Sequence, residues 1–225
     1  MKSLLPNMLT AFNLVLGFFA ILETINGDFF AAALLVFAAM IADGMDGRVA
    51  RMFGASSEFG KELDSLCDLV SFGVAPALMA YLFMLKEFGF WGACIAVAFA
   101  TGGALRLARF NVNTATVKGY FMGLPIPAAG CVVATFCMLD VRPAGIVFPI
   151  MVAGFAYLMV STIRYPDFKG KGEPIRSIPA ILAVILAVYL LVSFKNAYLF
   201  APFFSFAIFG ILNTVFGLFD SKSSK

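Results

Sequence analysis

Eight long apolar segments, separated by short polar stretches, constrain the fold of this chain more than any other feature of its sequence. A helix needs about 20 apolar residues to cross a bilayer, whereas a barrel strand needs about 10. A helix also satisfies its own backbone hydrogen bonds in lipid. The sequence therefore predicts an all-α integral membrane protein, a bundle of about eight transmembrane helices. A six-span core with two re-entrant segments is the open alternative. The expected spans cover residues 7–25, 29–51, 59–85, 90–111, 122–139, 144–163, 178–194 and 197–218.

Composition excludes several classes of protein. Hydrophobic residues make up 62% of the chain and charged residues 13%, whereas soluble domains carry about half and a quarter. Histidine is absent, which excludes a histidine base, a Ser-His triad and a His-ligated metal. The net charge of +3 is too small to indicate a nucleic-acid partner. The four cysteines form no CxxC pair and lie in apolar runs, so they are expected to be core residues without a disulfide.

The lysines and arginines are distributed unequally between the two sides of the expected bundle. With eight spans, both termini and every even-numbered connection share one side, which holds 13 of the 16 basic residues. Cytoplasmic loops carry such an excess, so both termini are expected to be cytoplasmic. The basic residues of that side are Lys2, Arg48, Arg51, Lys61, Arg106, Arg109, Lys118, Arg164, Lys169, Lys171, Arg176, Lys222 and Lys225, against Lys86, Arg142 and Lys195 on the other.

Four aspartates lie where the second span ends and the third begins. Asp43 and Asp46 are three residues apart, and Asp64 and Asp68 are four apart, so each pair shares one helix face. A short turn joins the two helices, which places both pairs at a similar depth. One aspartate at a helix end is often a solvated cap, but four in paired register need a compensating positive charge. Oxygen-only sites suit Mg²⁺ or Mn²⁺, and paired ions suit phosphoryl chemistry.

The full pattern around these acids is specific. Asp43-x2-Asp46-Gly47-x2-Ala50-Arg51-x8-Gly60-x3-Asp64-x3-Asp68 has eight fixed residues, and it resembles the signature of the CDP-alcohol phosphotransferase family. The resemblance implies a membrane enzyme that transfers a phosphatidyl group from a CDP-linked lipid to an alcohol and releases CMP. It implies two divalent cations held by the four aspartates, with Asp68 also the catalytic base.

The resemblance also implies a nucleotide and diphosphate site. Gly47, Arg51 and Gly60 of the motif are expected to line it. Asn7 and Thr10, in the segment Pro6-Asn7-x2-Thr10, resemble a family feature near the nucleotide. The glycines can admit a substrate close to the backbone, although helix contact in a membrane is an alternative role for each of them.

Two later segments bear on the acceptor. Arg106 and Arg109 share a helix face and can hold a carboxylate or phosphate, although anchoring at the cytoplasmic surface is an alternative. The runs RLARFN, which ends at Asn111, and FMGLPIPAA resemble the phosphatidylserine synthase branch of the family. This implies CDP-diacylglycerol and L-serine as substrates, with Arg106, Arg109 and Asn111 binding serine or a phosphate.

The sequence also allows another acceptor and another function. A phosphorylated or other polar alcohol is an alternative acceptor, and a divalent-cation transporter is an alternative function. The resemblance further implies a homodimer. We expect the protein in a prokaryotic plasma membrane, and the distribution of lysines and arginines, with the cytoplasmic location of CDP-lipids, predicts an active site at the cytoplasmic face. We expect one membrane domain over residues 1–225, with catalytic helices in 6–140 and additional helices in 141–225.

Overall fold

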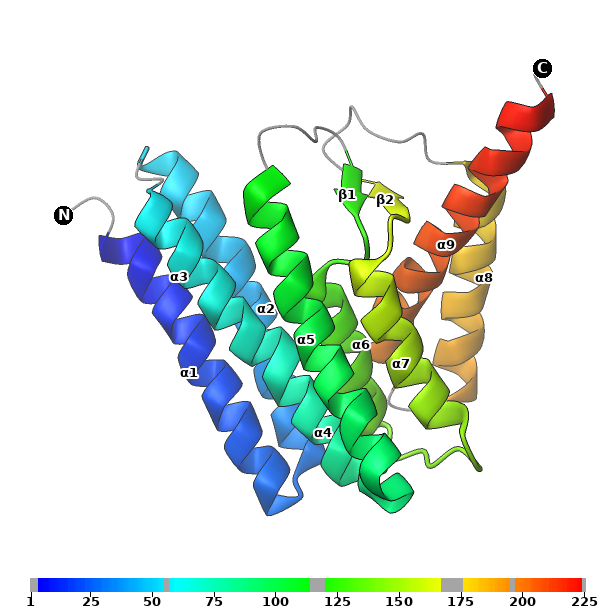
Figure 1. The fold of residues 1–225 in the computed structure, drawn as a ribbon, viewed down its shortest axis with the longest axis horizontal. Coiled ribbons are helices and arrows are strands. Elements are labelled where there is room, and N and C mark those ends of the chain that lie inside the picture. The colour runs from blue at the N-terminus through cyan, green and yellow to red at the C-terminus, as the bar shows by residue number, and fades with distance from the viewer. Residues whose placement is uncertain (1–3, 55–56, 114–119, 167–175, 195–196, 224–225) are drawn as a thin grey trace.

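The structure is a computed structural model that describes residues 4–54, 57–113, 120–166, 176–194 and 197–223. Helices run side by side along most of its length, and a small two-stranded ribbon lies near one end (Figure 1). The elements are α1 (Leu4–Asn26), α2 (Phe29–Met52), α3 (Glu58–Asp68), η1 (Leu69–Val74), α4 (Ala75–Phe83), η2 (Leu85–Phe88), α5 (Gly89–Asn113), β1 (Tyr120–Met122), α6 (Ile126–Met138), α7 (Val147–Val160), β2 (Arg164–Pro166), α8 (Ser177–Ser193) and α9 (Phe200–Ser223).

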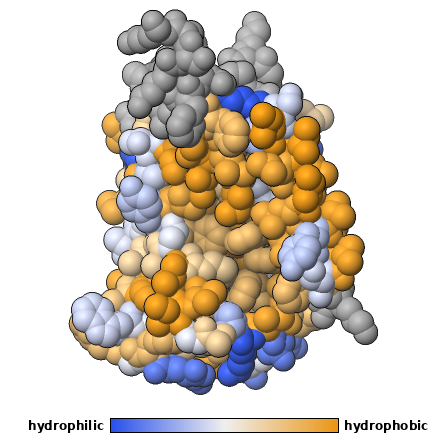
Figure 2. Space-filling model, turned by 90° about the vertical axis from the view of Figure 1, so that its right-hand side faces the viewer, coloured by the Kyte–Doolittle hydropathy of each residue, from blue (hydrophilic) through white to orange (hydrophobic). Residues whose placement is uncertain are grey.

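The expected helical membrane bundle is confirmed. Five helical segments in the described residues are long and apolar enough to cross a membrane, and three further apolar helices, α6, α7 and α8, are shorter. Exposed side chains along α8, such as Ile181, Val184, Val188 and Val192, are the kind that lipid covers. Figure 2 shows a largely apolar face whose hydrophilic residues gather toward its ends.

The third expected span is one continuous rod made of α3, η1 and α4. Its middle section, η1, is a π-helix that starts directly after Asp68. A π-turn accommodates an extra residue within a helix, and such turns are frequent at functional sites. The rod therefore has its irregular turn beside an acidic residue of the sequence motif.

The start of α6 differs from the expected span. Instead of beginning at residue 122, α6 begins at Ile126, because Gly123 has a φ of +76° and Pro125 is the N-cap. Residues 120–122 pair instead with β2 in an antiparallel ribbon, with Phe121 opposite Tyr165. The expected polar loops, 112–119 and 164–176, lie mostly outside the described residues. Within them, α5 continues to Asn113 and 164–166 form β2.

Aromatic side chains and close backbone approaches form the centre of the bundle. The Phe83 ring packs edge-on against Phe29 and Phe148, with ring centroids 5.3 and 5.6 Å away. Gly130 of α6 lies against η1, where an added Cβ would come within 2.5 Å of the Phe72 carbonyl oxygen. All four cysteines are free thiols. This packing fixes η1, and with it the end of α3, against the rest of the bundle.

Candidate active site

The acidic motif lies on two helices joined by a short connection. Asp43 and Asp46 belong to α2, and Asp64 and Asp68 to α3. Helix α3 begins with Ser57 as its N-cap, whose hydroxyl accepts a hydrogen bond of 3.0 Å from the Gly60 amide. A side-chain cap of this kind satisfies a backbone N–H that the first helical turn leaves free. The cap thus defines where α3, the helix that carries Asp64 and Asp68, begins.

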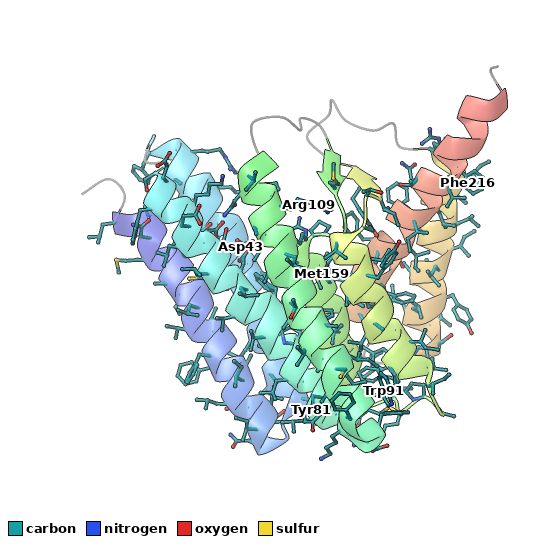
Figure 3. The ribbon with its side chains drawn as sticks, in the orientation of Figure 1. Asp43, Tyr81, Trp91, Arg109, Met159 and Phe216 are labelled. Atoms are coloured by element: carbon teal, nitrogen blue, oxygen red, sulfur yellow. The ribbon has the colours of Figure 1, made fainter. Side chains whose placement is uncertain are left out.

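Three of the four motif aspartates come together. Asp43, Asp64 and Asp68, here called the acid cluster, each offer a carboxylate oxygen, and these oxygens lie within 4.8 Å of one another. Asp46 is outside this group and accepts a 2.6 Å hydrogen bond at Oδ2 from the Thr10 hydroxyl. Figure 3 shows Asp43 in the same half of the bundle as Arg109, away from Tyr81 and Trp91.

The donor set of the acid cluster fits a divalent cation. Oδ1 of Asp64 is buried and has no hydrogen-bond partner among the described residues. A buried carboxylate oxygen without a partner is costly, and a bound cation is one way to satisfy it. Oxygen-only ligands of this kind suit hard ions such as Mg²⁺ and Mn²⁺.

Two polar side chains of α1 donate hydrogen bonds to the motif aspartates. Besides the contact of Thr10 with Asp46, the Nδ2 of Asn13 donates a 3.0 Å hydrogen bond to Oδ1 of Asp68. Asn13 is fully buried, and the sequence reasoning missed it. Its signal was available, since it stands one helical turn after Thr10 in an otherwise apolar run.

A cavity of about 650 Å³ opens beside Asp46 and Asp64. It lies between α1, α2, α3 and the end of α5. All five residues predicted to line the nucleotide and diphosphate site are among its lining residues, namely Asn7, Thr10, Gly47, Arg51 and Gly60. Lys61 and Phe110 also line the cavity, and the sequence reasoning did not assign them to the site.

Gly60 allows α1 and α3 to approach each other closely at the cavity. An added Cβ at Gly60 would come within 3.3 Å of the Asn7 side-chain oxygen and 3.2 Å of the Ser57 hydroxyl. On α2, Arg51 lies over Gly47, with its Nη1 3.6 Å from the position of an added Cβ. The two glycines therefore border on polar groups that face the cavity.

The two arginines predicted for the acceptor have different environments. Arg109 donates hydrogen bonds of 2.9 to 3.1 Å to the backbone carbonyls of Val160, Ser161 and Met122. It therefore ties α5 to the end of α7 and to β1. A cation at the C-terminus of α7 also stabilises that helix end. The sequence reasoning did not anticipate this role.

Arg106, by contrast, is buried at 7% exposure, and its Nε has no hydrogen-bond partner among the described residues. Its guanidinium carbon lies 5.9 Å from the centre of the Phe110 ring. It is also close enough to Asp68 to experience that carboxylate's charge. A buried guanidinium with an unused donor is available for an anionic group.

Asn111 links the end of α5 to α3. Its Nδ2 donates a 2.9 Å hydrogen bond to the Ser65 hydroxyl. Its backbone carbonyl accepts a 3.0 Å hydrogen bond from the Lys61 ammonium. The Asn111 side chain of α5 therefore contacts α3 at Ser65, the residue that follows Asp64.

A helical membrane bundle with a carboxylate cluster beside an open cavity defines a class of protein, polytopic membrane proteins with an acidic site. The chain belongs to one family within that class, CDP-alcohol phosphatidyltransferase, whose model matches residues 3–216.

Curated relatives cover most of the chain. It is 43% identical over 173 residues to a CDP-diacylglycerol–serine O-phosphatidyltransferase of Helicobacter pylori, covering 74% of this chain and 73% of the relative. A protein of the same name from Methanocaldococcus jannaschii is 35% identical over 215 residues, or 95% of each chain. An archaetidylserine synthase of Methanothermobacter thermautotrophicus is 38% identical over 170 residues, covering 75% of this chain and 72% of the relative.

Proposed function

We propose that this chain transfers the phosphatidyl group of CDP-diacylglycerol to the hydroxyl of L-serine, giving phosphatidylserine and CMP. The acid cluster beside a 650 Å³ cavity carries the proposal, because it places metal-binding carboxylates next to room for a nucleotide. The family and the names of its relatives supply the reaction.

The reaction is a substitution at phosphorus. The serine hydroxyl oxygen forms a bond to the phosphatidyl phosphorus of CDP-diacylglycerol, and the bond from that phosphorus to the CMP oxygen breaks. Asp68 accepts the proton of the serine hydroxyl as the general base. Asp43, Asp46, Asp64 and Asp68 would hold two divalent cations, Mg²⁺ or Mn²⁺, which would supply positive charge to the diphosphate.

The cavity holds the nucleotide part of the substrate. Arg51 pairs with the diphosphate, since a guanidinium suits phosphate oxygens. Gly47 and Gly60 leave room for it beside the helix backbones, and the Asn7 side chain lies within reach at the start of α1. Thr10 contributes by holding Asp46.

We assign different roles to the two arginines of α5. Arg106 has a buried, unused donor near Asp68, and it receives the serine carboxylate. The guanidinium of Arg109 is committed to three backbone carbonyls, and it holds the surrounding frame. Asn111 remains a candidate acceptor-binding residue through its contact with Ser65.

The membrane arrangement follows from the charge distribution. Helix α1 begins and α9 ends at the same end of the bundle (Figure 1), and among the described residues Arg51 near the end of α2, Lys61 near the start of α3 and Arg109 near the end of α5 lie toward that end. We therefore place it at the cytoplasmic face of a prokaryotic plasma membrane. The homodimer and the division into 6–140 and 141–225 stay predictions.

The decisive experiment presents the purified full chain with CDP-diacylglycerol, Mg²⁺ or Mn²⁺, and one acceptor at a time. The acceptors are L-serine, glycerol phosphate, inositol phosphate and none, and the measurement is CMP release together with the lipid product. CMP and phosphatidylserine should form with serine alone. Faster CMP release with a phosphorylated acceptor would overturn the choice of serine, and no release with any of them would overturn the transferase.

A further inference from the structure

Asn13 is a polar side chain that the proposed reaction does not yet use. It lies in the middle of an apolar helix and is fully buried, yet its Nδ2 reaches Oδ1 of Asp68, 55 residues later in the chain, at 3.0 Å. Burying an amide in a membrane helix is unfavourable unless its polar atoms are satisfied. The presence of a buried amide beside Asp68 therefore indicates a role for the Asn13 side chain at the site.

A backbone contact next to Asn13 fixes the distance between α1 and the rod of α3 and η1. The Ser71 hydroxyl, on the π-helix, donates a 3.0 Å hydrogen bond to the backbone carbonyl of Asn13. One turn further along α1, Gly17 packs directly on Ser71, and a Cβ at Gly17 would overlap the Ser71 hydroxyl. Asn13 thus faces Asp68 because a close helix contact holds it there.

The second polar atom of the Asn13 side chain argues against a purely stabilising role. Its Oδ1 is buried and has no hydrogen-bond partner among the described residues. An unsatisfied buried acceptor is unfavourable. The Oδ1 end of the Asn13 amide is therefore unfavourable for stability, whereas its Nδ2 end restrains Asp68.

We propose that Asn13 is a positioning residue for Asp68. Its Nδ2 holds Oδ1 of the carboxylate and thereby leaves Oδ2 for the acid cluster and the acceptor hydroxyl. The inference rests on the proposed function, because it assigns Asp68 a part in metal binding and proton transfer. Mutating a residue that holds a metal ligand without touching the metal typically lowers metal affinity or activity by about 10- to 100-fold.

The test replaces Asn13 with leucine, which has nearly the same volume and no donor. Thr24→Val is the matched control, because Thr24 is a buried polar residue of the same helix whose hydroxyl donates a hydrogen bond to the Ala20 carbonyl and contacts none of the motif aspartates among the described residues. Asn13→Leu should lower kcat by about 10- to 100-fold and leave KM for CDP-diacylglycerol unchanged. Thr24→Val should match the wild type in both. Asn13→Ala provides a second variant if the leucine protein fails to fold.

A binding measurement separates positioning from stability and does not depend on turnover. The midpoint of the Mn²⁺-induced rise in Tm should move to about 10-fold higher Mn²⁺ in Asn13→Leu, but not in Thr24→Val. An unchanged midpoint together with wild-type kcat per folded molecule would overturn the role of Asn13. If the wild type releases no CMP, the proposed function fails, and the Mn²⁺ midpoint still decides whether Asn13 orients Asp68.

Discussion

The Thr10 hydroxyl donates a hydrogen bond of 2.6 Å to Oδ2 of Asp46, joining the first helix to the second across 36 residues of sequence. The distance is typical of a hydroxyl bound to an ionised carboxylate. Because Asn13 of the same helix binds Asp68 of the third span, α1 holds one carboxylate from each arm of the motif. Helix α1 is therefore part of the site as well as a membrane span.

Replacing Thr10 with valine keeps the shape of the side chain and removes its donor. A hydrogen bond to a charged group is worth about 1.5–3 kcal/mol, so kcat/KM for CDP-diacylglycerol should fall by about 10- to 100-fold. Thr10→Ser, which keeps the hydroxyl, should retain most of the activity. CMP release at several lipid concentrations measures the effect. Equal activity of the valine and serine variants would show that the hydroxyl is dispensable.

Asp68→Asn should remove turnover without removing the fold. The amide has the size of the carboxylate but cannot accept the proton of the serine hydroxyl, and loss of a general base typically costs about 10²- to 10⁴-fold in rate. The measurement is single-turnover CMP release. Gel filtration and Tm in detergent serve as the control for folding. A folded Asp68→Asn protein with wild-type turnover would exclude Asp68 as the base.

Removing divalent cations should abolish the reaction and destabilise the protein. The acid cluster holds three carboxylates within 4.8 Å of one another, and without a cation they repel. Treatment with EDTA should stop CMP release and lower Tm, and Mg²⁺ or Mn²⁺ should restore both. Asp64→Asn should weaken this response, because Oδ1 of Asp64 is a buried carboxylate oxygen without a hydrogen-bond partner among the described residues. Full activity in EDTA would contradict the metal site.

Much of this architecture could be predicted from the sequence, because its signals are local. Apolar run length predicts the helices, and the spacing of Asp64 and Asp68 within one helix places both on one face. The tie between Arg109 and three carbonyls, and the ribbon that delays α6, could not be predicted in this way. Both depend on contacts between residues 13 to 52 positions apart, which no local periodicity records.

Asn13 also shows that local sequence signals do not predict contacts between distant residues. Its sequence signal, a polar residue one turn after Thr10, indicates a shared helix face. That signal does not say which acid the residue meets. The pairing with Asp68 depends on how closely α1 packs on η1, and this distance is determined by the absence of a side chain at Gly17.

The two arginines of α5 should respond differently to the same substitution. Arg106→Leu removes the cation proposed for the serine carboxylate, so it should raise KM for serine and leave Tm close to that of the wild type. Arg109→Leu breaks three hydrogen bonds to the Val160, Ser161 and Met122 carbonyls. It should lower Tm by about 2–4 °C for each kcal/mol lost, with KM for serine unchanged in the folded fraction.

Serine titrations and thermal unfolding of the two purified variants measure this difference, and each variant serves as the control for the other. Because both substitutions remove one positive charge from the same helix, a general electrostatic effect would change both proteins alike. A larger rise of KM for serine in Arg109→Leu than in Arg106→Leu would reverse the assignment. In that case the bonds of Arg109 to the backbone would have to give way when serine binds.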